Sequence, residues 1–80
     1  KFKTLYHNLK KINFPFSNVK SFRYFEADRW DLITINNKTI KLPSENYIKS
    51  LKNYLNIKDK ESFEKFVIFD YRINDQLILK

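Results

Sequence analysis

The 80-residue chain contains no cysteine and no glycine. Without cysteine, it can form neither a disulfide nor a thiolate metal site. Without glycine, it has no Walker-type phosphate loop and no dinucleotide fingerprint, because both need glycine where the backbone approaches the phosphates. The only histidine, His7, and the scattered carboxylates show no metal-ligand or catalytic spacing. We therefore expect a domain that is not an enzyme and that binds no cofactor and no metal.

Long apolar runs are also missing, since no stretch approaches the ~20 residues that span a bilayer. We expect a soluble, single domain over residues 1–80, trimmed from a longer protein because it does not begin with Met. A domain of this size buries only roughly 60–65% of its surface on folding. Aromatic residues make up 18% of the chain and compensate, because each ring buries a large area.

Acidic residues are fewer than basic ones, and the formal net charge is +7. Most of the positive charge is lysine, which is abundant together with asparagine and isoleucine. All three have AT-rich codons, so the base composition of the gene is one explanation. The other is attraction to a nucleic acid or to an anionic membrane surface.

Apolar spacing predicts the order helix, three strands, helix, two strands. This order indicates an α+β fold, a helix–three-strand meander–helix–closing β-hairpin, with a mainly antiparallel twisted sheet and helices on one face. The predicted helices cover Phe2–Ile12 and Tyr47–Leu55, with a possible further turn at Glu61–Lys65, and the predicted strands cover Val19–Ala27, Trp30–Ile35, Thr39–Leu42, Val67–Ile73 and Gln76–Lys80.

Local signals place the connections between these elements. Asn36-Asn37 indicates a two-residue hairpin loop, because asparagine tolerates positive φ. Ser44 is the predicted N-cap of the second helix, with Glu45 favourable against the helix dipole. The predicted core comprises Trp30 and the helix faces of Leu5, Leu9, Leu51 and Leu55.

Residues 67–80 are the most informative stretch, because they read as a buried strand, a tight polar turn and a strand that ends the chain. Alternation puts Val67, Phe69, Tyr71 and Ile73 on one face and Ile68, Asp70 and Arg72 on the other. A final strand often lies at a sheet edge, where its unpaired backbone can receive another strand. The Asp70–Arg72 pair is either a solvated ion pair or an arginine held to grip an acidic partner group.

The segment from Arg29-Trp30 through Asn36-Asn37 to Leu42-Pro43 resembles the Arg-Trp, strand, turn, strand, Leu-Pro segment of the bacterial cell-division FtsQ (DivIB) family. The following helix, the Asp-x-Arg pattern at Asp70-Tyr71-Arg72 and the closing apolar strand resemble the family in order and spacing. Three departures are Asp28 where the family often has arginine, Asn37 where it has glycine, and Tyr71 where it has leucine.

The resemblance implies a non-catalytic divisome scaffold module at the C-terminal part of the family's periplasmic β domain. It implies a single-pass anchor in the inner membrane, outside this chain, and recruitment of FtsB, and through it FtsL, by strand addition. No contact with nucleic acid is expected, and contact with the membrane is expected only through that anchor. The expected partner-binding residues are Arg72, Ile73, Gln76, Leu77, Ile78, Leu79 and Lys80.

The competing hypothesis is a basic nucleic-acid-binding α+β module, since RNA-binding sheets expose aromatic residues beside basic ones. Here the strand aromatics fall at positions expected to face the core, and the RNP signature is absent. Lysines are spread along the chain rather than massed in one segment. Weaker binding with rising salt would distinguish a phosphate-driven contact from strand addition.

Overall fold

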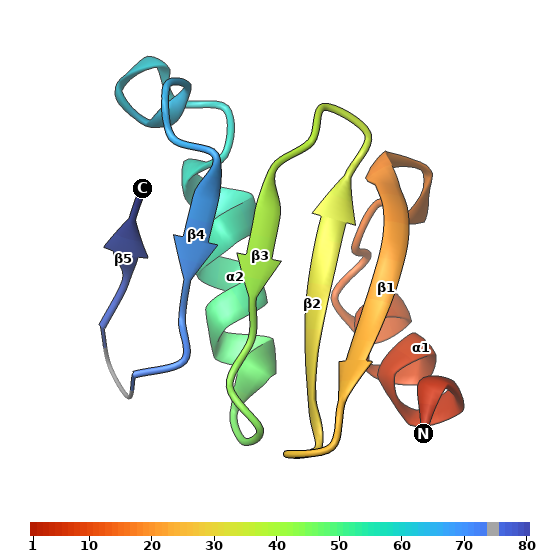
Figure 1. Ribbon diagram of the computed structural model, residues 1–80. Helices are drawn as coiled ribbons and strands as arrows, with labels where there is room; N and C mark the ends of the chain where they lie inside the picture. Colours follow the sequence, from red (N-terminus) through yellow and green to blue (C-terminus); the bar gives the residue numbers. More distant parts are fainter. Residues whose placement is uncertain (74–75) are drawn as a thin grey trace.

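The computed structural model describes residues 1–73 and 76–80 and shows two α-helices and a five-stranded sheet (Figure 1). The helices are α1 (Phe2–Lys11) and α2 (Tyr47–Ile57), with 3₁₀ turns at Phe16–Asn18 and Glu61–Phe63, and the strands are β1 (Val19–Phe25), β2 (Arg29–Thr34), β3 (Thr39–Lys41), β4 (Ile68–Asp70) and β5 (Ile78–Leu79).

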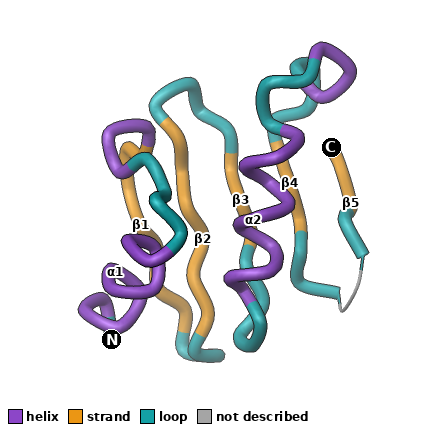
Figure 2. The backbone as a smooth tube through the Cα atoms, turned by 180° about the vertical axis from the view of Figure 1, so that it is seen from behind, coloured by secondary structure: helices purple, strands orange, loops and turns teal. Residues whose placement is uncertain are grey.

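The strands lie in the order β1-β2-β3-β4-β5. All neighbours are antiparallel except β3 and β4, which are parallel. A parallel pair needs a long crossover connection, and α2 lies in the one that joins these two strands. Both helices cover the same face of the sheet, α1 over β1 and β2 and α2 over β3 and β4 (Figure 2). The α+β prediction is confirmed. We call the helix-free side the open face.

The core lies between this helix layer and the central strands. Leu5 and Leu9 of α1 and Leu51 of α2 are buried, which confirms the predicted helix faces. Trp30 and Leu55 pack against this core but are only partly buried, so their predicted burial is partly correct. Trp30 lies near the start of β2, beside the edge strand β1. The centroid of its ring is 5.9 Å from that of Phe2 in α1. The strands contribute the buried residues Leu32, Ile40 and Phe69.

Both hairpins of the meander close through three-residue loops. Thr34 N–H donates to the Lys38 carbonyl at 2.8 Å, Asn37 N–H donates to the Thr34 carbonyl at 2.9 Å, and Asn37 has φ 64°. These bonds and the positive φ match the common three-residue hairpin loop, in which a turn is closed by a left-handed residue. The predicted two-residue loop is therefore wrong by one residue. The first hairpin repeats the arrangement, with Asp28 at φ 60°.

The start of α2 differs from the prediction. The helix begins at Tyr47, and its N-cap is Asn46, with φ 60° and no side-chain capping bond. Ser44 is not the cap. Its hydroxyl instead donates to the Ala27 carbonyl at 2.8 Å and joins the β3–α2 loop to the first hairpin. A tertiary contact therefore takes the hydroxyl that local sequence assigns to the helix.

The C-terminal hairpin has shorter strands than predicted, because β4 ends at Asp70 and β5 begins at Ile78. Phe69 and Tyr71 are buried, whereas Val67 and Ile73 are about half exposed, so the predicted common buried face is only partly correct. The predicted polar turn includes positions 74–75, which lie outside the described residues.

Candidate partner-binding edge

The strand β5 forms one edge of the sheet, as the sequence predicts. Ile68 and Lys80 exchange two backbone hydrogen bonds of 3.1 Å, so the N–H and C=O of Lys80 point toward β4. Bonded and non-bonded pairs alternate between antiparallel strands, and Phe69 faces Leu79. The N–H and C=O of Leu79 therefore point outward, away from the sheet. This outward backbone is what a strand of another chain can bind.

The side chains of β5 alternate between the two faces. Leu77 and Leu79 are half-buried and pack against the core on the helix side. Ile78 lies on the open face opposite Asp70. An edge with apolar residues and no charged side chain at its centre is a weak barrier against pairing with another strand.

Arg72 forms a forked ion pair with Asp70. Its Nη2 lies 2.7 Å from Oδ2, and its Nε lies 2.9 Å from Oδ1 and 3.1 Å from Oδ2. The Asp70 side chain is 7% exposed and that of Arg72 is 45% exposed. The hydrogen bond from the guanidinium lowers the pKa of Asp70 and raises that of Arg72. The pair is therefore not a fully solvated one, because a buried carboxylate of this chain holds the partly exposed guanidinium in place.

The ion pair belongs to a row of alternating charges across the open face. Asp31 faces Lys41, and Lys41 faces Asp70 in the register of neighbouring strands. Arg29 extends the row, because its Nη1 donates to Asp31 Oδ1 at 2.7 Å. Opposite charges at paired strand positions stabilise a sheet. The row therefore fixes Asp70, and through it Arg72, on the open face.

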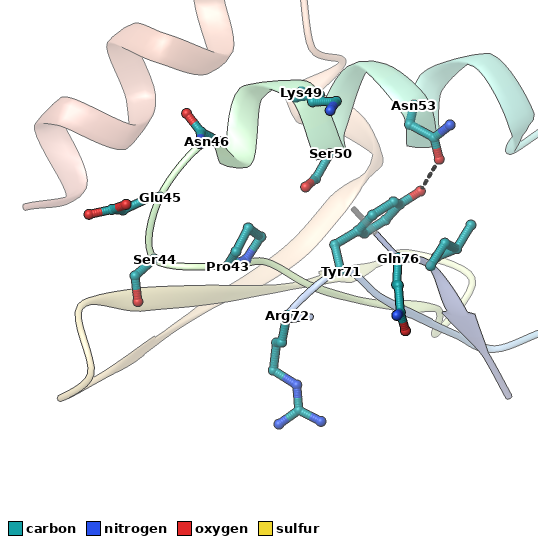
Figure 3. A pocket seen from close by; sticks show the side chains of 11 residues that line it. Pro43, Ser44, Glu45, Asn46, Lys49, Ser50, Asn53, Tyr71, Arg72 and Gln76 are labelled. Carbon is teal, nitrogen blue, oxygen red and sulfur yellow. Dashed lines mark hydrogen bonds between the residues drawn. The ribbon is translucent and has the colours of Figure 1, made fainter. Parts of the chain in front are cut away.

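On the helix side, a cleft of about 750 Å³ lies between α2 and the segment that joins β4 to β5 (Figure 3). Tyr71 points into it, and its hydroxyl donates to Asn53 Oδ1 at 2.8 Å. Burial raises the pKa of Tyr71 well above its ordinary value, with the neighbouring Tyr54 adding to the shift. Arg72 also lines the cleft, and Figure 3 shows its side chain directed away from α2.

The predicted partner-binding residues fall into three places. Leu77, Ile78, Leu79 and Lys80 form or adjoin β5, and Gln76 lines the cleft together with Leu77. Arg72 lies on the open face, and Ile73 is exposed beyond the end of β4. The structure thus brings all but Ile73 to the edge or to the two surfaces beside it.

Sequence reasoning missed the contribution of α2 to this region. Asn46, Ser50 and Asn53 line the cleft. They lie more than 20 positions before Gln76 in the sequence. No local pattern marks them, since polar residues on the outer side of a helix are ordinary. Only the parallel crossover that places α2 beside β4 brings them to the edge.

Within residues 1–73 and 76–80, no group of three or more histidine or acidic side chains is placed to hold a metal ion. None of the helices in these ranges is long and apolar enough to cross a membrane. Comparisons with known proteins found no matching family model, no matching curated protein and no matching solved structure.

Proposed function

We propose that this chain is a non-catalytic protein-binding module that accepts a partner's β-strand at the outer edge of β5. The observation that carries the proposal is the outward-pointing N–H and C=O of Leu79 on an edge strand. Backbone hydrogen bonds would supply the affinity of such a contact, and alternate side chains would supply its specificity.

The opposite edge is less suited to the same role. β1 exposes Lys20 and Arg23 along its length. Exposed charges on an edge strand discourage pairing with another chain. β5 has only the apolar Ile78 and Leu79 within its strand. Of the two free edges, we therefore assign the partner to β5.

Arg72 supports specificity for an acidic partner. Added strands lie about 4.8 Å apart, so a partner strand would be about 10 Å from the position of Arg72 in the β4 row. A glutamate on the partner extends further than an aspartate toward a guanidinium held there. The bonds to Asp70 use Nε and Nη2, and Nη1 makes none with the described residues. Nη1 is therefore the donor that we assign to a partner carboxylate.

The resemblance to the FtsQ family supplies the biological context of the proposal. Under it, the partner strand belongs to an FtsB-like protein that carries FtsL with it, and the module works on the periplasmic side of the inner membrane during septum formation. The position of β5 at the sheet edge and Arg72 in the Asp-x-Arg pattern support this context. A basic nucleic-acid module remains the alternative class.

Amide hydrogen exchange tests the edge directly. Adding an FtsB-like peptide should protect the amide of Leu79 strongly. The amide of Lys80 should change little, because it already donates to Ile68 at 3.1 Å. Protection of Leu79 that is complete without peptide, or unchanged by it, would contradict the proposal.

A backbone substitution gives the matched control. N-methylation of Leu79 removes the outward donor and keeps the side chain, so it should weaken peptide binding while the fold survives. N-methylation of Ile78 removes a donor that points toward β4, so it should destabilise the hairpin itself. Equal peptide affinity of the Leu79 variant and the parent chain would mean that the partner does not add a strand here.

A further inference from the structure

Most of the net positive charge of the molecule comes from its two helices. The two helices hold five of the sixteen basic residues and none of the nine acidic ones. The strands and loops hold all the acidic residues, so their charges nearly balance. Both helices cover the same face of the sheet (Figure 2), so their five lysines add positive charge to one side of the molecule. The sequence alone shows these lysines as scattered, because they belong to two distant segments.

The lysines of α1 point away from the core. Leu5 and Leu9 face the sheet, and helical spacing places Lys3, Lys10 and Lys11 on the opposite side, where all three are exposed. On α2, Lys52 is exposed in the same way. These four lysines form no ion pair with a described residue, which leaves their charge available to an external anion.

Exposed aromatic rings border this lysine layer at its β1 side. Phe2 is 44% exposed and Tyr6 is 39% exposed. Their rings are held by aromatic neighbours, with Phe2 packed edge-on against Phe22 at 5.1 Å and Tyr6 against Phe16 at 4.7 Å. Lys10 Nζ lies 5.6 Å above the Tyr6 ring. Aromatic rings beside lysines are typical of the boundary between headgroups and acyl chains in a membrane.

We propose that the helix layer docks on the surface of an anionic phospholipid bilayer. The lysine ammonium groups of Lys3, Lys10, Lys11 and Lys52 contact lipid phosphates, and Phe2 and Tyr6 enter the headgroup region at the margin. The apolar face of α1 stays in the core, because Leu5 and Leu9 are buried there. The chain therefore adsorbs by charge and does not insert a helix. The β5 edge lies outside this layer, so the contact is independent of strand addition.

A membrane fits this surface better than a nucleic acid. Base stacking needs an aromatic ring with an open face, whereas Phe2 and Tyr6 already pack against other rings. The layer is also built from lysine, which acts as a point charge, rather than from arginine forks that read phosphate or base geometry.

Vesicle co-sedimentation of the 80-residue chain tests the proposal. Vesicles of phosphatidylcholine mixed with phosphatidylglycerol should bind the chain, and vesicles of phosphatidylcholine alone should not. Each lysine near an anionic surface contributes about 1 kcal/mol, or about fivefold in partitioning. The triple variant Lys3→Gln, Lys10→Gln and Lys11→Gln should therefore bind about 100-fold more weakly. Raising the salt from about 0.1 M to about 1 M should release the parent chain.

The matched control is a second triple variant with Lys20→Gln, Lys60→Gln and Lys65→Gln. It has the same net charge as the first triple variant but keeps all the lysines of α1 and α2. Its vesicle binding should fall less than about fivefold. If the first triple variant loses its helical circular dichroism, a double variant with Lys3→Gln and Lys52→Gln replaces it, because these changes avoid the last turn of α1. The vesicle binding of this double variant should be about 25-fold weaker than that of the parent chain.

Three outcomes would overturn the proposal. The first is no binding to phosphatidylglycerol vesicles, and the second is equal loss in the two triple variants, which would mean that only net charge matters. The third is displacement from vesicles by a single-stranded or duplex DNA oligonucleotide that binds more tightly through the same lysines. That result would assign the layer to nucleic acid. Peptide binding at β5, measured in parallel, should be the same in all these variants.

Discussion

The forked pair of Arg72 and Asp70 should contribute measurably to stability, which Arg72→Ala tests. The substitution removes three contacts of 2.7 to 3.1 Å from a carboxylate whose side chain is 7% exposed. Breaking a fully buried pair costs about 3–5 kcal/mol, and an exposed pair is worth about 0–1 kcal/mol. The arginine is 45% exposed, so water can replace part of the loss. We expect an intermediate cost of about 1–2 kcal/mol in the free energy of unfolding.

The pH dependence gives the effect a sign. Arg72 lowers the folded-state pKa of Asp70 below the ordinary value of 3.8. A lowered carboxyl pKa stabilises the folded chain above the unfolded-state pKa, and this stabilisation is lost as the pH falls through the folded-state pKa. The difference between the parent chain and Arg72→Ala should therefore be full at neutral pH and should shrink in the acid range below pH 3.8.

Urea unfolding at neutral and acid pH measures both quantities. With a slope of about 1 kcal/mol per molar urea for a small domain, the midpoint at neutral pH should fall by about 1–2 M. Arg72→Lys keeps the positive charge but loses the forked geometry, so its urea midpoint should lie between those of the parent chain and Arg72→Ala. A midpoint that does not move at neutral pH, or a shift that is the same at every pH, would show that the pair does not stabilise the fold.

The remaining predictions concern the core, a turn and the cleft. Leu51→Ala should cost about 2–5 kcal/mol in denaturant melts, since Leu51 is fully buried, and a loss below about 1 kcal/mol would contradict the packing of α2. Asn37→Gly should be neutral or stabilising by up to about 1 kcal/mol, because the residue has φ 64°, whereas Asn37→Ala should destabilise, and the reverse order would contradict the left-handed turn. Tyr71→Phe should cost about 1 kcal/mol in the same melts through loss of the bond to Asn53, and no loss would mean that water replaces it.

The sequence determined the elements and the fold class. The apolar spacing of Leu5 and Leu9 in one segment and of Leu51 and Tyr54 in another specifies two helices with one buried face each. The β-branched and aromatic residues around Leu32 specify a strand. These patterns are local, because each residue's direction from its own helix or strand follows from backbone geometry alone. The edge position of the last strand was also predicted from its place at the chain end.

Prediction from local sequence was less accurate where two hydrogen-bond partners or two turn types have similar energies. The hydroxyl of Ser44 can cap a helix or bond elsewhere, and the structure pairs it with Ala27, 17 residues away. The predicted length of the loop after β2 was wrong by one residue, because Asn37 suits a left-handed position in both a two-residue and a three-residue turn. Short-range propensity does not separate such alternatives when they differ by little energy.

Tertiary structure alone decided the candidate sites. The parallel pairing of β3 with β4 places α2 beside the β5 edge and creates the cleft around Tyr71. It also aligns Asp31, Lys41 and Asp70 in one row. The packing of both helices on one face turns scattered lysines into a basic layer. Each of these surfaces joins residues that are distant in sequence. Their proximity is set by the pairing order of the strands, which depends on the packing of the whole chain.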